Sequence, residues 1–140
     1  ILAGLRDPST GNHQKTLPTK NPGRISVIKY FSAEEKMLAK EIETKHVHLD
    51  VIVAYAYSAT YIWTALETPP SELRDHLEVN VIRMFALLQS IYSLLKASTP
   101  SPRFIAIPSW AASLTAFIYV PAGHTCYGAS SIAVNYIGKK

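Results

Sequence analysis

The chain has 140 residues, of which 48% are hydrophobic and 17% charged, a composition that indicates a folded domain and excludes a disordered one. Its net charge of +4 comes from scattered lysines and arginines with no long basic run, so we expect no nucleic-acid partner. The single cysteine, Cys126, has only His124 beside it, which favours a reducing compartment and predicts neither a disulfide nor a metal site.

The first 30 residues predict two strands separated by a loop. Residues 1–4 are apolar and precede a turn-prone segment, so they are expected to form the tip of a strand. Residues 8–24 are rich in Pro, Gly, Asn, Thr and Lys, which indicates a loop or a poorly formed helix. Residues 24–30 alternate and contain β-branched side chains, which is typical of a strand.

Three helices and two further strands are predicted in the rest of the chain. A capping box at Ser32 begins a helix that ends near Lys45. The continuous apolar run 49–54 is typical of a strand covered on both faces. Apolar residues recur every three or four positions over 70–97, which predicts a long helix that Pro100 prevents from continuing. A short buried strand at 103–107 and a helix starting near Tyr127 complete the predicted elements.

Strands that alternate with helices indicate parallel crossovers, so residues 1–140 are predicted to form a single α/β domain with an open, Rossmann-like parallel sheet. In such sheets the ligand binds at the carboxyl ends of the strands. That edge would be formed by Gly4–Asp7, Phe31, Tyr55–Ala59 and Ser109–Ser113.

A membrane-associated protein is a further hypothesis, which the sequence does not favour. Residues 104–138 contain no Lys, Arg, Asp or Glu, but Pro108 and Pro121 argue against one continuous apolar helix, so we expect no membrane partner. The chain begins without a secretory signal pattern, and we expect a cytoplasmic location.

Tyr127 raises a chemical question. A phenol has a pKa of about 10 and usually needs a nearby cation to transfer protons near neutral pH. Position i+4 lies on the same helix face, but in this chain it is Ser131. Tyr127 is therefore a catalytic acid, a disabled one, or a packing residue.

Four segments in chain order resemble elements of the short-chain dehydrogenase/reductase family. The strand before Tyr55-Ala56-Tyr57 resembles the one that runs into Asn-Ala-Gly, and Glu78-Val79-Asn80-Val81 resembles an Asn-Val element of the long helix. Ile107–Ser113 resembles the strand that bears the catalytic serine, and Tyr127–Ser131 resembles the Tyr-x-x-x-Lys motif. The sequence of these segments is most similar to that of fungal members of the norsolorinic acid ketoreductase type.

The resemblance implies hydride transfer between NADP(H) and a small-molecule carbonyl or alcohol. Tyr127 would protonate the carbonyl oxygen, Ser109 would orient that oxygen, and Asn80 would hold a water of the proton relay. Arg6 would face the adenosine 2′-phosphate. The other cofactor-binding positions are occupied by Phe31, Tyr55 and Ser131, where the family has an aspartate, an asparagine and a lysine.

Each of these residues also has a purely structural interpretation. Asn80 would then form hydrogen bonds across a helix contact, Ser109 would cap a turn, and Arg6 would be an ordinary loop cation.

Several departures from the family weaken the expected cofactor site. Ser131 replaces the lysine, which removes a cation whose loss costs about 10²–10⁴-fold in proton transfer. Tyr57 replaces a glycine, and its ring would crowd the cofactor. The family's first strand and glycine-rich phosphate turn have no counterpart in the sequence, so the sheet is expected to be incomplete and to lack its central strand.

Two functional hypotheses remain. The first is an NADP-dependent ketoreductase of fungal secondary metabolism, acting on an aromatic polyketide, with reduced or lost activity. The alternative is a non-catalytic remnant of the fold that binds a partner or forms a homo-oligomer. The resemblance implies that the helix 70–97 and the helix starting at Tyr127 would form those faces.

Overall fold

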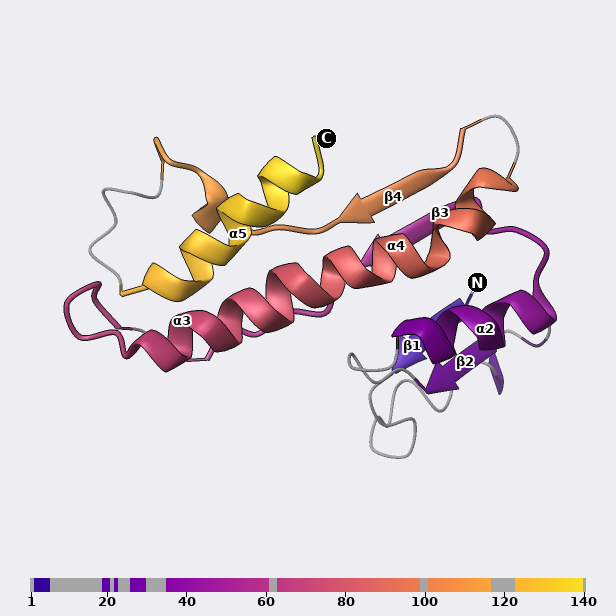
Figure 1. Cartoon of the computed structure of the whole chain (residues 1–140), viewed down its shortest axis with the longest axis horizontal. Helices are drawn as coiled ribbons and strands as arrows, with labels where there is room; N and C mark the ends of the chain where they lie inside the picture. The colour runs from indigo at the N-terminus through magenta and orange to yellow at the C-terminus, as the bar shows by residue number, and fades with distance from the viewer. Residues whose placement is uncertain are drawn as a thin grey trace.

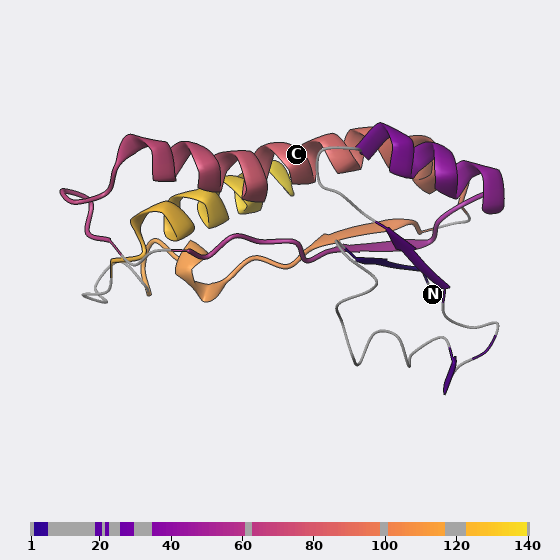
Figure 2. The ribbon, with the colours of Figure 1, turned by 90° about the horizontal axis from the view of Figure 1, so that it is seen from below.

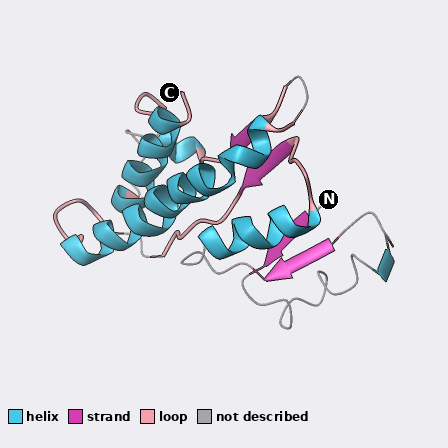
Figure 3. Cartoon of the chain, turned by 45° about the vertical axis from the view of Figure 1, so that its right-hand side comes forward, coloured by secondary structure: helices cyan, strands magenta, loops and turns pink. Residues whose placement is uncertain are grey.

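A computed structural model describes residues 2–5, 19–20, 22, 26–29, 35–60, 63–98, 101–116 and 123–139 (Figures 1 and 3). The elements follow in the order β1 (Leu2–Leu5), β2 (Ser26–Lys29), α2 (Glu35–Lys45), β3 (Val51–Ala54), α3 (Pro70–Leu77), the π-helix η1 (Glu78–Ile82), α4 (Arg83–Lys96), β4 (Arg103–Ala106), the 3₁₀-helix η2 (Trp110–Ala112) and α5 (Thr125–Ile137). This alternation of strands and helices confirms the predicted α/β class.

The strands form two separate parallel pairs. β1 pairs with β2, and β3 pairs with β4, with Val51 opposite Arg103 and Ala54 opposite Ala106. Figure 2 shows the helices α2 to α5 on one side of the strands. An open α/β sheet would join the two pairs through a central strand, so the arrangement is the incomplete sheet that the sequence predicted.

The expectation that β3 is covered on both faces is wrong. Val51 and Val53 are 53% and 56% exposed, whereas the side chains between and after them are partly buried. The cause is that the described helices lie on one side of the strands only, so alternate positions of the apolar run face solvent.

The predicted long helix is confirmed as one helical run, α3–η1–α4. It begins after Pro69, which has an extended backbone, and Pro70 occupies the first turn, where its missing N–H costs nothing. The sequence did not predict the π-turn at Glu78–Ile82, which carries Asn80. Such turns occur frequently at functional sites.

The apolar side of this helical run supplies half of the buried hydrophobic residues in the described part of the chain. Leu94 packs against Ile42 of α2, and Val81 and Met84 pack against Val134 of α5. The predicted three-and-four spacing is thereby confirmed, since it places these side chains on the buried stripe of the helix.

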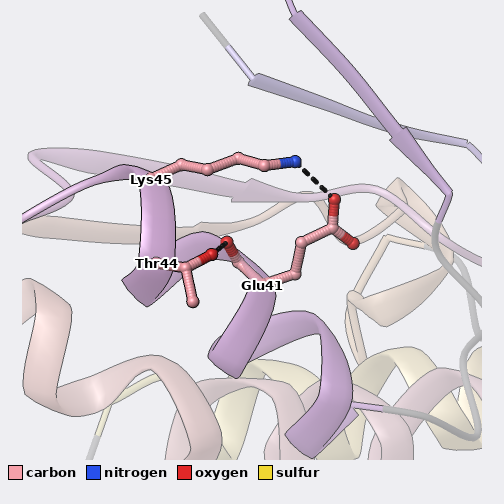
Figure 4. Close-up of polar contacts among 3 residues, drawn as sticks. All are labelled: Glu41, Thr44 and Lys45. Atoms are coloured by element: carbon pink, nitrogen blue, oxygen red, sulfur yellow. Dashed lines mark hydrogen bonds and ion pairs between the residues drawn. The ribbon is translucent and has the colours of Figure 1, made fainter.

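Helix α2 ends in a small polar arrangement (Figure 4). Lys45 Nζ lies 2.8 Å from Glu41 Oε1, and the Thr44 hydroxyl donates to the Glu41 carbonyl at 2.7 Å. The ion pair is exposed and contributes about 0.3–0.5 kcal/mol at most. The capping residue predicted at Ser32 lies outside the described residues.

Within the described ranges, no helix is both long and apolar enough to cross a bilayer. The same ranges contain no group of three or more His, Cys, Asp or Glu side chains that could hold a metal ion.

Candidate functional site

A buried hydrogen-bond network centres on Asn80, whose side chain is 0% exposed. Its Oδ1 accepts the Ser58 backbone N–H at 2.7 Å, and its Nδ2 donates to the Ser58 carbonyl at 3.0 Å and to Ser130 Oγ at 2.9 Å. Ser130 Oγ in turn donates to the Tyr127 carbonyl at 3.0 Å. One amide thus joins the loop after β3, the π-turn and α5.

The structural interpretation of Asn80 is therefore realised, because it forms hydrogen bonds across a helix contact. Both of its amide hydrogens are used by protein acceptors. A buried amide with its groups satisfied is stabilising, whereas the same group without partners would be costly. A role in holding a relay water stays a prediction.

The start of α5 is held close to the loop after β3. His124 forms an isolated parallel bridge with Trp63, and the Thr125 hydroxyl donates to the Trp63 carbonyl at 3.2 Å. A Cβ on Gly123 would lie 2.4 Å from the Trp63 carbonyl carbon, so only glycine fits at this contact. Tyr127 lies in the first turn of α5, two residues after Thr125.

Ser109 caps the short helix η2. Its Oγ accepts the Ala111 N–H at 3.3 Å, which is the turn-capping role that the sequence left open. A hydroxyl that accepts in this way still has its own hydrogen to donate. η2 packs against α5, where a Cβ on Gly128 would meet the Ala111 carbonyl oxygen at 3.4 Å. The turn of Ser109 and the helix of Tyr127 are thus neighbours.

Tyr57 packs directly against Tyr127. The ring centroids lie 6.0 Å apart with an interplanar angle of 76°, an edge-to-face geometry. The Tyr57 hydroxyl is buried and has no hydrogen-bond partner. Burial, and then the neighbouring Tyr127, raise the pKa of Tyr57 to about 12. Tyr57 is therefore a neutral phenol over the whole physiological range.

The four predicted cofactor-binding positions do not form one described cluster. Ser131 is 0% exposed, and its Oγ has no hydrogen-bond partner. Tyr55 is 75% exposed at the end of β3. Arg6 and Phe31 lie outside the described residues.

The described residues do not fit the nicotinamide end of a dinucleotide. At the position where the resemblance places a lysine, the chain has a buried hydroxyl that contacts no donor or acceptor. Beside Tyr127, where a flat ring would need space, the chain has the ring of Tyr57. Neither side chain can supply the positive charge that lowers a phenol pKa.

Comparison with known proteins supports the resemblance to short-chain dehydrogenases/reductases. No family model matches the chain. The chain is 27% identical over 146 residues to the short chain dehydrogenase gsfK of Penicillium aethiopicum, covering 99% of this chain and 57% of that relative. It is 29% identical over 147 residues to norsolorinic acid ketoreductase of Aspergillus parasiticus, covering 100% of this chain and 54% of that relative.

The chain is thus similar in sequence to members of the short-chain dehydrogenase/reductase family. Among its members it is similar to fungal norsolorinic acid ketoreductases, and it spans about half the length of the curated relatives it matches.

Solved structures show the same fold. The carbonyl reductase Sniffer of D. melanogaster superposes with a TM-score of 0.84 at 22% identity, covering 97% of this chain and 60% of that one. RhlG of Pseudomonas aeruginosa, solved as an NADP active-site complex, superposes with a TM-score of 0.82 at 22% identity, covering 98% of this chain and 54% of that one. These likenesses confirm an incomplete Rossmann-like fold.

Sequence reasoning placed Ser58 in the expected ligand-binding edge and Ser130 in the Tyr127 motif without giving either a role, and it missed Gly123. The one available signal was Asn80 itself, because an amide on the apolar stripe of a helix must find partners inside the protein. Which residues those partners are depends on contacts between segments far apart in the chain, 22 residues for Ser58 and 50 for Ser130.

Proposed function

We propose that residues 1–140 are a partial, Rossmann-like domain of an NADP-dependent short-chain oxidoreductase lineage, of the ketoreductase type, with reduced or lost activity. The substrate class is a small-molecule carbonyl or alcohol, and the fungal relatives favour an aromatic polyketide of secondary metabolism. A cytoplasmic location without a membrane or nucleic-acid partner belongs to the same proposal.

The observation that carries this proposal is the Asn80 network. It joins the helix of Tyr127 to the loop after β3, and η2 holds the Ser109 turn against the same helix. These are the elements that bear the proposed proton donor, the proposed oxygen-orienting hydroxyl and the proposed relay residue. Solved relatives complexed with NADPH or NADP support the cofactor class.

Reduced or lost activity follows from the composition of the same site. Ser131 brings no positive charge to Tyr127, and proton transfer by a phenol near pH 7 depends on such a charge. Residues 1–140 also contain no glycine-rich turn to hold a pyrophosphate on backbone N–H groups. In the 140-residue chain tested by itself, both the charge beside Tyr127 and this turn are therefore missing.

Titration of NADPH fluorescence with the 140-residue chain tests the cofactor claim. We expect weak binding or none, and micromolar affinity would overturn that expectation. The short chain dehydrogenase of Escherichia coli CFT073 that was solved in complex with NADPH serves as the positive control.

Turnover gives a second test. The substitution Ser131→Lys restores the cation but not the phosphate turn, so we expect no measurable reduction of norsolorinic acid by the single variant. Measurable turnover would show that the phosphate turn is not required.

The chain extended by the coding sequence upstream of Ile1 tests the enzyme lineage. A glycine-rich segment there should produce NADPH binding, and an unrelated segment would favour the non-catalytic remnant of the fold.

The alternative function is a partner-binding or dimerising module. It is supported by large apolar side chains exposed along α4 and α5, among them Phe85 at 41%, Tyr92 at 60% and Tyr136 at 66%. Exposed aromatic residues are enriched at protein interfaces. A self-complementary use of these helices would give a two-fold homodimer.

Sedimentation equilibrium distinguishes this module from a monomer. We expect Phe85→Glu to shift the chain toward monomer, because a buried interface does not accept an unpaired charge. Val47→Glu, at an 86% exposed position outside these helices, is the matched control. A monomer mass for the unmodified chain at every concentration would exclude the dimer, and an equal dimer mass for all three proteins would exclude Phe85 from its interface.

A further inference from the structure

The ring of Tyr57 lies along one face of α5. It contacts the Tyr127 ring edge-to-face at 6.0 Å, and it also packs against the core cluster that contains Val134. Tyr127, Ser131 and Val134 are spaced by four and three residues, so they share that helix face. Because Tyr57 contacts Tyr127 and packs against the cluster that Val134 forms with Val81 and Met84, its ring lies next to the row that carries Ser131.

The burial of Ser131 agrees with this placement. Its side chain is 0% exposed and its Oγ has no hydrogen-bond partner, although a serine on an open helix face would be hydrated. The Tyr57 hydroxyl is likewise buried without a partner. Two unpartnered buried hydroxyls are costly, so apolar packing of the Tyr57 ring has to offset their desolvation.

The backbone that carries Tyr57 is held in place. Its neighbour Ser58 forms two hydrogen bonds with Asn80, through the backbone N–H at 2.7 Å and the carbonyl at 3.0 Å. Because Asn80 is fully buried in the π-turn, the loop cannot swing away without breaking both bonds. The Tyr57 ring is therefore held in a fixed position beside α5.

We propose that Tyr57 closes the site beside Tyr127, so that a flat heteroaromatic ligand cannot reach Tyr127 and Ser131 unless this ring is removed. The proposal rests on the proposed function, because it takes Tyr127 as the reaction centre. It adds a cause of lost binding that is separate from the missing lysine and the missing phosphate turn. Tyr57 is then the residue that determines which ligands can reach Tyr127.

The unmodified chain provides a first test that requires no variant. Nuclear Overhauser effects between the Tyr57 ring protons and the Ser131 β-protons should be observed, together with those between the Tyr57 and Tyr127 rings. Their absence in a folded sample, with the core contacts of Tyr57 retained, would overturn the proposal.

Nicotinamide alone, at millimolar concentration, is the ligand probe for the second test. The Tyr127 ring signals of ¹³C-tyrosine-labelled protein should shift on titration in Tyr57→Gly, with affinity about tenfold or more above the unmodified chain, since no aromatic pair blocks the site. Tyr57→Phe keeps the ring and removes only the unpartnered hydroxyl, so it should stay closed.

The outcomes separate this proposal from the proposed function. Nicotinamide has no phosphate and undergoes no turnover in this assay, so inactivity toward ketones does not affect the result. Equal shifts in the unmodified chain and in Tyr57→Gly would overturn the closed site. If Tyr57→Gly fails to fold, Tyr57→Ala is measured in its place, and no Tyr127 shift in a folded small-residue variant would also overturn it.

Discussion

The Asn80 amide donates to the Ser130 hydroxyl at 2.9 Å, and both side chains are 0% exposed. This bond connects the π-turn of the long helical run to the helix that carries Tyr127. Because Asn80 also holds both backbone groups of Ser58, it is the point at which three segments of the candidate site meet.

Replacing this amide should therefore destabilise the chain strongly. Asn80→Ala leaves the Ser58 N–H, the Ser58 carbonyl and the Ser130 hydroxyl with one partner fewer, and we expect a loss of about 2–4 kcal/mol in the free energy of unfolding. Urea unfolding followed by circular dichroism measures it. Asn135→Ala, at an exposed position of α5, should change stability by less than about 0.5 kcal/mol. Equal effects would show that the network contributes nothing.

The adjacent serines of α5 should respond in opposite directions. Ser130→Ala removes a hydroxyl that accepts from Asn80 and donates to the Tyr127 carbonyl, so we expect a loss of about 1–2 kcal/mol. Ser131→Ala removes a buried hydroxyl without a partner, so it should be neutral or stabilising by up to about 1 kcal/mol. Thermal unfolding of the two variants side by side provides the comparison, and a larger loss for Ser131→Ala would refute it.

Tyr57 should make the free energy of unfolding depend on pH in alkaline solution. Its folded pKa of about 12 lies above the unfolded value of about 10. The contribution of the neutral phenol is therefore fully present below pH 10 and is lost as pH rises through the folded pKa. Between those values the unmodified chain should lose more stability than Tyr57→Phe, in which this group does not titrate. Parallel pH profiles of the urea midpoint would contradict the raised pKa.

The single thiol offers a probe of the contact between α3 and α5. Burial, and then the Glu72 carboxylate, raise the pKa of Cys126, while a hydrogen bond with Thr68 lowers it. Reaction with a disulfide reagent near pH 8 should be slow in the folded chain and fast in urea, because the thiolate is the reactive form. Glu72→Gln should speed the folded reaction, whereas Asp75→Asn, at an exposed position of α3, should leave it unchanged. A Glu72→Gln rate equal to that of the unmodified chain would count against the electrostatic cause.

Two glycines near Tyr127 should tolerate alanine differently. At Gly123 the added Cβ would lie 2.4 Å from the Trp63 carbonyl carbon, so Gly123→Ala should cost about 1–3 kcal/mol as the backbones move apart. At Gly128 the nearest atom, the Ala111 carbonyl oxygen, is 3.4 Å away, and alanine favours a helix interior by up to about 1 kcal/mol. Gly128→Ala should therefore be neutral or stabilising. Similar melting temperatures for the two variants would rule out the close approach at Trp63.

The sequence by itself determined the order of the elements and the class of protein. Apolar spacing along 70–97, the proline at its start and the short β-branched strands are local patterns, and local patterns report backbone periodicity directly. The replacement of a lysine by Ser131 was also readable, because a motif is defined by spacing along one helix.

Only the tertiary structure decided what each candidate side chain contacts. Asn80 and Ser109 became a cross-helix bond and a turn cap, β3 proved to be open on one face, and the Tyr57 ring came to lie against Tyr127. These outcomes depend on which helices cover which strands and on pairs of residues 22 to 70 positions apart (Ser58 with Asn80, and Tyr57 with Tyr127). The physical reason is that burial and hydrogen bonding are properties of packed neighbours, and periodicity along the chain does not specify which neighbours those are.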